Sequence, residues 1–363
     1  MSRIERIQNS LSKTGIDLLV LKEQGNIIYA IDSEQPVSGM LLIPRSGEAR
    51  LLVTPLESVN MSSSLNDVRV VRLDRGEGYL QGLFKEKPAG LRYVEFDSLE
   101  MHEALRLEKE LCVLVKTGSR IVREMRMVKD AREIDKVKRA AEIASQTVCE
   151  ITSRLSEGAA EVEVACEYDS RIVLKGAFKP AFETIVAFGE NSSNPHSTPS
   201  LRRLKKGDIV LIDAGADYFN YKSDLTRTMV FGERLEGSDA ALMIEAVEEA
   251  KKAAERKAFP GVKACEIDRL ACEVLEEYGL GKYFAHGLGH GVGIDIHEPP
   301  SISPSSNEEL KAGNIITIEP GVYVPGVGGA RVEDTYLVTD SGPLKLTLAS
   351  CKWGSSNAFL KTV

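Results

Sequence analysis

Carboxylates stand at the ends of apolar runs at four places in the second half of this sequence. Asp213 and Glu319 each close such a run, and Asp224 and Glu333 open the extended segment that follows. Apolar runs of this length are typical of buried strands. Burying an unpaired carboxylate costs on the order of several kcal/mol, so these acids need a bound cation or must lie in solvated loop ends.

The acids of each pair are expected to lie close together. If the strand that ends at Asp213 pairs antiparallel with the strand that begins at Asp224, the two carboxylates come side by side, and the same holds for Glu319 and Glu333. Directly opposed Cβ atoms lie about 4.5–5.5 Å apart, where like charges repel unless a cation separates them. A divalent metal site accounts for the pattern, and solvated loop ends are the alternative.

Histidines gather in the same part of the chain. Four of the five lie there in short segments that contain Gly or Pro, namely His196, His286, His290 and His297. Any one of them alone is more often a structural or surface histidine, but together with the acids they indicate a functional site. The six cysteines form no CxxC pair, so we expect metal ligands to be oxygen and nitrogen; the cysteines are Cys112, Cys149, Cys166, Cys265, Cys272 and Cys351.

A chain of 363 residues is long enough for two domains. Residues 1–122 are predicted to form an α/β domain, with a helix over 2–14 and strands over 17–21, 26–31, 40–43, 51–54, 68–73, 94–97 and 112–115. Residues 123–363 are predicted to form an α+β domain of two similar halves. Its predicted helices begin at 130, 161, 238 and 263, and its predicted strands cover 182–188, 208–214, 226–231, 314–319 and 331–338.

Composition excludes several classes of partner. A formal net charge of -8 disfavours nucleic acid, whose binding relies on Lys and Arg. The sequence contains no apolar run near the ~20 residues that cross a bilayer, so no membrane span is expected. The first residues mix charges where a secretory signal would have a continuous apolar stretch, and we expect a cytoplasmic location.

Five segments, in order, resemble the pita-bread metallopeptidase family that includes methionine aminopeptidase, aminopeptidase P and prolidase. They are Asn194-Pro195-His196, Asp213 with the segment 223–228 (SDLTRT), the segment 286–293 (HGLGHGVG), the segment 317–321 (TIEPG) and the segment 331–334 (RVED). The resemblance covers about residues 123–345. The preceding α/β domain resembles the N-terminal domain of the Xaa-Pro branch, which favours prolidase or aminopeptidase P.

The resemblance implies a role for each matching residue. It makes Asp213, Asp224, His290, Glu319 and Glu333 the ligands of two divalent metal ions. Mn²⁺ or Co²⁺ is expected, with Zn²⁺ or Fe²⁺ as further options, because an oxygen-rich set with one imidazole suits these ions. Such a pair activates water as the nucleophile.

Further residues are expected to contact the substrate. His297 resembles the histidine that binds the scissile carbonyl, His196 resembles a second histidine near the substrate, and Glu319 is the candidate for proton transfer. His286 and Arg331 match positions that shape the pocket or bind a carboxylate. For Arg331 an ion pair that orients Glu333 or Asp334 is the alternative.

The expected activity is hydrolysis of the Xaa-Pro bond of dipeptides. This bond has no amide N–H and constrains the chain, so general peptidases fit it poorly. The alternatives are an Xaa-Pro aminopeptidase that acts on longer peptides and a non-catalytic binding module on the same fold. The resemblance also implies a homodimer.

Overall fold

A computed structural model describes residues 1–58, 64–65, 67–232 and 236–348 of the chain. Contacts divide the chain into two units, Met1–Arg126 and Met127–Val363, and each is described by itself. Cys351 of the sequence analysis lies outside the described residues. Among the helices described, none is both long enough and apolar enough to cross a membrane.

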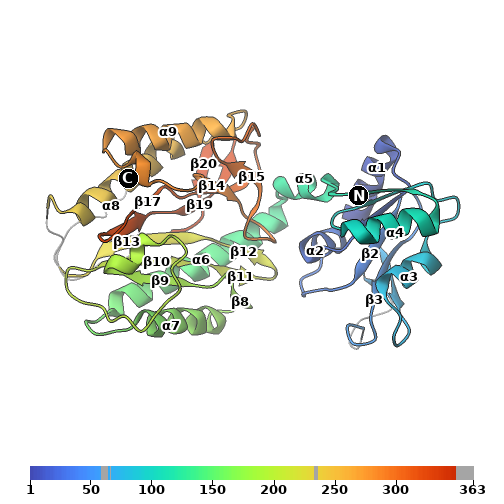
Figure 1. Ribbon diagram of the computed structural model, residues 1–363, viewed down its shortest axis with the longest axis horizontal. Helices are drawn as coiled ribbons and strands as arrows, with labels where there is room; N and C mark the ends of the chain where they lie inside the picture. Colours follow the sequence, from blue (N-terminus) through green and yellow to red (C-terminus); the bar gives the residue numbers. More distant parts are fainter. Residues whose placement is uncertain (59–63, 66, 233–235, 349–363) are drawn as a thin grey trace. The chain divides into compact units, whose positions relative to one another are not determined.

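A mixed sheet forms the centre of the first unit (Figure 1). Its strands are, in spatial order, β4 (Ser64–Leu65), β5 (Val68–Arg72), β3 (Ala49–Val53), β2 (Met40–Pro44), β1 (Leu18–Leu21), β6 (Tyr93–Phe96) and β7 (Leu114–Thr117). The helices of this unit are α1 (Arg3–Thr14), α2 (Gln24–Ile31), α3 (Tyr79–Glu86), α4 (Met101–Leu111) and α5 (Ile121–Met127). The last residue of α5, Met127, is the first residue of the second unit. The sheet pairs β1 with β2 antiparallel and with β6 parallel.

The prediction of a strand over 26–31 is wrong, because these residues belong to α2. Seven of the eight residues of this helix are buried, so its apolar side chains show no 3.6-residue period. A short apolar run buried on nearly all sides cannot be assigned to helix or strand from periodicity alone.

The first half of the second unit begins with two packed helices, α6 (Ala131–Arg154) and α7 (Glu161–Leu174). Asp130 caps α6, since its side chain accepts hydrogen bonds from the N–H groups of Arg132 and Glu133. The helices pack against β9 and β10 through a buried apolar cluster. The other elements of this half are β8 (Lys179–Pro180), β9 (Ile185–Phe188), η1 (Gly189–Ser193), β10 (Ile209–Ala214), β11 (Ala216–Tyr218), β12 (Tyr221–Lys222) and β13 (Leu225–Val230).

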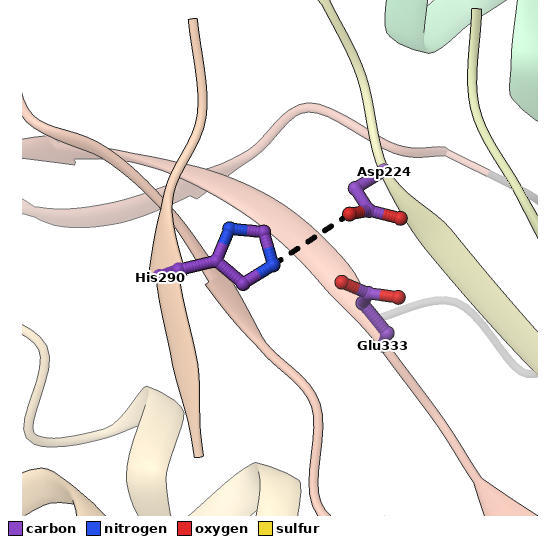
Figure 2. A group of neighbouring side chains, drawn as sticks. All are labelled: Asp224, His290 and Glu333. Atoms are coloured by element: carbon purple, nitrogen blue, oxygen red, sulfur yellow. Dashed lines mark ion pairs between the residues drawn. The ribbon is translucent and has the colours of Figure 1, made fainter. Parts of the chain in front are cut away.

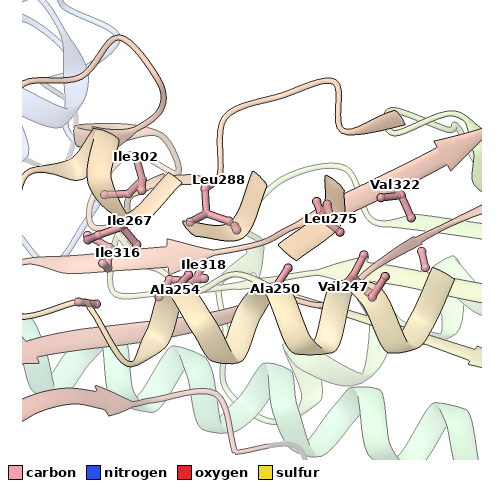
Figure 3. Close-up of a cluster of buried hydrophobic side chains, with 14 of the residues drawn as sticks. Val247, Ala250, Ala254, Ile267, Leu275, Leu288, Ile302, Ile316, Ile318 and Val322 are labelled. Carbon is pink, nitrogen blue, oxygen red and sulfur yellow. The ribbon is translucent and has the colours of Figure 1, made fainter. Parts of the chain in front are cut away.

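The second half repeats this order of helices and strands. Its elements are α8 (Asp239–Glu255), α9 (Ala264–Glu277), η2 (Gly281–Tyr283), β14 (Gly289–Gly291), β15 (Glu298–Ile302), β16 (Ile315–Ile318), β17 (Gly321–Val324), β18 (Gly328–Arg331), β19 (Asp334–Thr339) and β20 (Gly342–Lys345). Figure 3 shows side chains of α8 and α9, among them Ala254 and Leu275, packed with those of β16, such as Ile318. Each half thus has two helices and an antiparallel strand pair, β10 with β13 and β16 with β19. The predicted fold class is confirmed.

The predicted single strand over 331–338 is two strands, β18 and β19, which Val332 and Glu333 separate. At this break the N–H of Glu333 donates to the carbonyl oxygen of Thr226 at 3.1 Å. A backbone hydrogen bond therefore joins the two halves at Glu333, a predicted metal ligand.

Candidate functional site

Strand pairing places the two acids of the first half on one face of the sheet. Asp213, near the end of the fully buried β10, is opposite Thr226 in the register with β13. Asp224 lies two positions before Thr226, immediately before β13 begins. The two carboxylates are therefore diagonal neighbours rather than directly opposed as expected, and diagonal positions on one face remain within reach of each other.

The second half brings its three predicted ligands from three strands. His290 lies in the middle of β14, Glu319 follows β16, and Glu333 precedes β19. His290 Nε2 lies 3.3 Å from Glu319 Oε1 and 3.7 Å from Asp224 Oδ2. One possible ligand atom from each of Asp224, His290 and Glu333 lies within 4.8 Å of the others, and Figure 2 shows these side chains pointing toward one another.

A single cavity of about 500 Å³ collects the predicted residues. All nine of them line it: His196, Asp213, Asp224, His286, His290, His297, Glu319, Arg331 and Glu333. The remaining histidine, His102, belongs to the first unit. The clustering expected from the sequence thus occurs in the structure.

Several buried carboxylate oxygens in this cavity have no hydrogen-bond partner among the described residues, namely Asp213 Oδ1, Asp224 Oδ1 and Glu333 Oε1. Burial, together with repulsion from Glu333 and Asp213, raises the pKa of Asp224 well above its usual value. Burial and repulsion from Glu319 and Asp213 do the same to the pKa of Glu333. Buried acids that repel one another need a cation, and oxygens with an imidazole nitrogen are ligands for a divalent metal ion, so the residues present fit one.

His290 and Glu319 interact favourably with each other. Burial opposes the charge on each, yet their mutual hydrogen bond and attraction raise the pKa of His290 and lower that of Glu319. His290 Nδ1 lies 3.1 Å from the carbonyl oxygen of Gly291, which leaves Nε2 directed at the acids. A backbone contact of this kind fixes the orientation of a metal-binding imidazole.

Arg331 is held inside the protein by several partners. Its Nη2 lies 2.5 Å from Asp213 Oδ2, and its Nη1 donates to Tyr323 Oη at 2.5 Å. The alternative prediction, an ion pair of Arg331 with Glu333 or Asp334, is wrong, because its ion-pair partner is Asp213. Asp334 instead pairs with other cations, Arg227 at 2.7 Å, Lys251 at 2.5 Å and Lys345 at 3.0 Å.

Tyr323 and Thr226 support the predicted residues, and sequence reasoning did not single them out. Tyr323 Oη lies 2.9 Å from His286 Nε2, and it also accepts the hydrogen bond from Arg331. Thr226 Oγ1 donates to Glu333 Oε2 at 2.7 Å and accepts from Arg331 Nε at 3.1 Å. The sequence offered only a weak signal for Thr226, its place two residues after the predicted ligand Asp224.

The histidines of the cavity differ in their environments. His297 lies beside His290, with ring centroids 4.3 Å apart and planes at 75°. Burial, with the nearby charge of His290, lowers the pKa of His297, and burial lowers the pKa of His286. Both rings are therefore neutral at neutral pH. His196 lies in the loop after η1, where its N–H donates to Asn194 Oδ1 at 3.1 Å.

Known proteins resemble this chain over nearly its whole length. Residues 135–340 match the metallopeptidase family M24, and residues 3–128 match the creatinase/prolidase N-terminal domain. The Xaa-Pro dipeptidase of Pyrococcus horikoshii is 36% identical over 346 residues, which cover 95% of this chain and 96% of that one.

Solved structures agree with this match. The prolidase from Pyrococcus horikoshii OT3 superposes with a TM-score of 0.88 at 34% identity, covering 97% of this chain and 99% of that chain. The X-Pro aminopeptidase from Thermotoga maritima superposes with a TM-score of 0.86 at 29% identity, covering 97% and 99%. This chain therefore belongs to metallopeptidase family M24, in the branch with a creatinase/prolidase N-terminal domain, and is a metal-dependent peptidase.

Proposed function

We propose that the protein is an Xaa-Pro dipeptidase that hydrolyses the bond before proline and releases the N-terminal residue. The observation that carries the proposal is the convergence of the five acidic and imidazole ligands with three further histidines around one cavity. The likeness to the Xaa-Pro dipeptidase of Pyrococcus horikoshii supports the choice of substrate. We propose residues 1–122 as the N-terminal domain and residues 123–363 as the catalytic domain.

Two divalent metal ions per subunit are proposed, with Mn²⁺ or Co²⁺ preferred and Zn²⁺ or Fe²⁺ as further options. Asp213, Asp224, His290, Glu319 and Glu333 would hold them, and the unpartnered oxygens of Asp213, Asp224 and Glu333 support this assignment. When bound, such a pair lowers the pKa of a water molecule and polarises a carbonyl group.

The chain's own side chains then bind the peptide and move protons. Glu319, whose pKa is lowered despite its burial, is ionised at neutral pH and is proposed to accept a proton and pass it to the leaving nitrogen. His297 is neutral, so one ring nitrogen carries an N–H that is proposed to donate a hydrogen bond to the scissile carbonyl oxygen. His196 and His286, which also line the cavity, are proposed to contact the substrate.

One observation favours a second candidate, an Xaa-Pro aminopeptidase that accepts longer peptides. Arg331 is the only Lys or Arg among the described residues that line the cavity, and it is already paired with Asp213. The free carboxylate of a dipeptide therefore has no uncommitted guanidinium to bind. A peptide that continues beyond proline places a neutral amide at that point.

Cleavage of three peptides by metal-stripped protein, with Mn²⁺, Co²⁺ or Zn²⁺ added back, separates these functions. We expect rapid cleavage of Ala-Pro, slower cleavage of Ala-Pro-Ala, and activity that depends on the added metal. Preference for Ala-Pro-Ala would favour the aminopeptidase instead. Release of methionine from Met-Ala-Ala would reject the proline assignment. Inactivity on all three peptides with every metal would favour the non-catalytic binding module.

The homodimer and the cytoplasmic location are proposals as well. The dimer rests on the resemblance to the pita-bread metallopeptidase family alone. Sedimentation at micromolar concentration is expected to give twice the mass of 39.7 kDa. A profile at the mass of one chain would reject the dimer. Cell fractionation with an antibody would test the location.

A further inference from the structure

Glu161, the first residue of α7, has no exposed surface. A glutamate is rarely buried to this extent without partners. Its carboxylate accepts hydrogen bonds from the Phe188 N–H at 2.7 Å, from Asn191 Nδ2 at 3.0 and 3.1 Å, and from Ser200 N–H and Oγ at 3.0 and 2.6 Å. These donors come from the two ends of the segment 188–200 and from η1 near its beginning.

The part of this segment that forms a wall of the cavity is 195–199, which includes His196. The wall residues 195–199 follow η1 and belong to neither a helix nor a strand. The hydrogen bonds of this wall are few: Asn194 accepts from the N–H groups of His196 at 3.1 Å and Ser197 at 3.2 Å. The Pro195 carbonyl oxygen accepts from Arg331 Nη1 at a long 3.5 Å. The position of His196 therefore depends on how the ends of the segment are anchored.

The first turn of α7 also binds the far end of the segment through its backbone. The N–H of Glu161 donates to the carbonyl oxygen of Arg202 at 3.2 Å, and the N–H of Val162 donates to that of Ser200 at 3.1 Å. The carboxylate of Glu161 thus contacts Ser200 and its backbone N–H contacts Arg202, both of which follow His196 in the chain. A second anchor lies in η1, where Ser192 Oγ accepts from the Gly329 N–H at 2.8 Å.

We propose that Glu161 is a positioning residue for the substrate pocket, which fixes the segment 188–200 so that His196 is held at the cavity. Glu161 itself does not line the cavity. The inference rests on the proposed function, since it assigns His196 a contact with the substrate. An ionised carboxylate suits this place because it is an acceptor on both oxygens, and donors approach both of them.

The test compares Glu161→Gln with Glu167→Gln, an exposed residue on the same helix that pairs with Arg171 at 2.8 Å. In Glu161→Gln the new side-chain amide would point a donor at groups that already donate. We expect kcat/KM for Ala-Pro to fall roughly 10- to 100-fold through a higher KM, as misplacement of a binding group does. Metal content should stay unchanged, and Glu167→Gln should match the parent protein.

Deuterium exchange supplies a readout that does not depend on activity. In Glu161→Gln, exchange should accelerate in 188–200 and remain unchanged in β10. Ser200→Ala, which removes one donor and keeps the charge, should shift both KM and exchange in the same direction by less, and it serves if Glu161→Gln does not fold. Unaltered kinetics in folded variants, or faster exchange throughout the second unit with a normal KM, would overturn the proposal. If the parent protein cleaves no Xaa-Pro peptide, the proposed function fails, and exchange in 188–200 alone decides whether Glu161 orders the segment.

Discussion

Replacing Glu333 with glutamine is expected to lower kcat by roughly 10³-fold or more and also to raise the melting temperature of the metal-free protein. The first effect follows because the loss of a metal ligand removes several kcal/mol of transition-state stabilisation, at about 1.36 kcal/mol for each factor of ten. The second follows because Glu333 is a buried acid that repels its neighbours Asp213 and Glu319.

The sign of the stability effect comes from the raised pKa of Glu333 in the folded state. A carboxyl group whose folded pKa exceeds its unfolded value of about 4.3 binds its proton more tightly when folded, so stability falls as pH rises through that window. At neutral pH the unfolded chain carries Glu333 ionised, whereas the folded metal-free protein must either bind a proton there or bury the charge, so Glu333 destabilises the metal-free fold. Glutamine removes the charge, and its side-chain oxygen can still accept the hydrogen bond from Thr226.

Calorimetry of metal-stripped and metal-loaded samples, with kcat measured on Ala-Pro, checks both effects. Without metal the variant should melt above the parent protein, by about 2–4 °C for each kcal/mol gained. With metal the order should reverse, because a ligand that binds only the folded state stabilises the parent more. Glu273→Gln on α9 is the control, since Glu273 is exposed and its pair with Arg269 is long, at 3.7 Å. A variant that melts lower in both states would contradict the repulsion inferred here.

Replacing His297 with glutamine is expected to lower kcat roughly 10²–10³-fold, the usual loss when a donor to a developing oxyanion is removed. His297 lines the cavity beside His290 and is neutral, so one ring N–H can donate a hydrogen bond while the ring carries no charge. Because His297 is not a predicted metal ligand, the variant should bind as much metal as the parent protein. KM should change far less than kcat.

Steady-state kinetics combined with metal analysis by mass spectrometry separates the possible roles. His102→Gln is the matched control, because this histidine belongs to the first unit and is exposed. Loss of metal from His297→Gln would assign the residue to the support of His290, whose ring it contacts. A kcat equal to that of the parent would remove His297 from the reaction.

The gathering of the four acids could be predicted because burying carboxylates at the ends of apolar strands is costly without a cation, whereas the proposed set of five ligands, with His290, came from the resemblance to the pita-bread family. The register between β10 and β13 could not be predicted from the sequence. Whether Asp213 pairs with Thr226 or with Asp224 depends on where the connection between the two strands ends. The sequence shows both acids but not the β11–β12 hairpin between them. Residue types thus predicted the site, and the strand offset had to come from the structure.

Neighbouring acids show a second limit of the sequence. Glu333 and Asp334 are adjacent, but burial and repulsion raise the pKa of Glu333. Asp334 is buried as well, yet attraction to Arg227, Lys251 and Lys345 outweighs the burial and lowers its pKa far below the usual value. The three cations come from β13, α8 and β20, so only the tertiary fold brings them together. No local pattern distinguishes two such acids.

The five proposed metal ligands are spread from residue 213 to residue 333 and come from both halves of the second unit. A growing chain that ends before Glu333 cannot offer the full set, so a metal pair held by all five residues cannot direct the folding of the first half during synthesis. Metal loading is then a late event that follows the meeting of the two halves. A cell short of the metal would accumulate folded, inactive chains, and these would become active when the metal returned, without new protein synthesis.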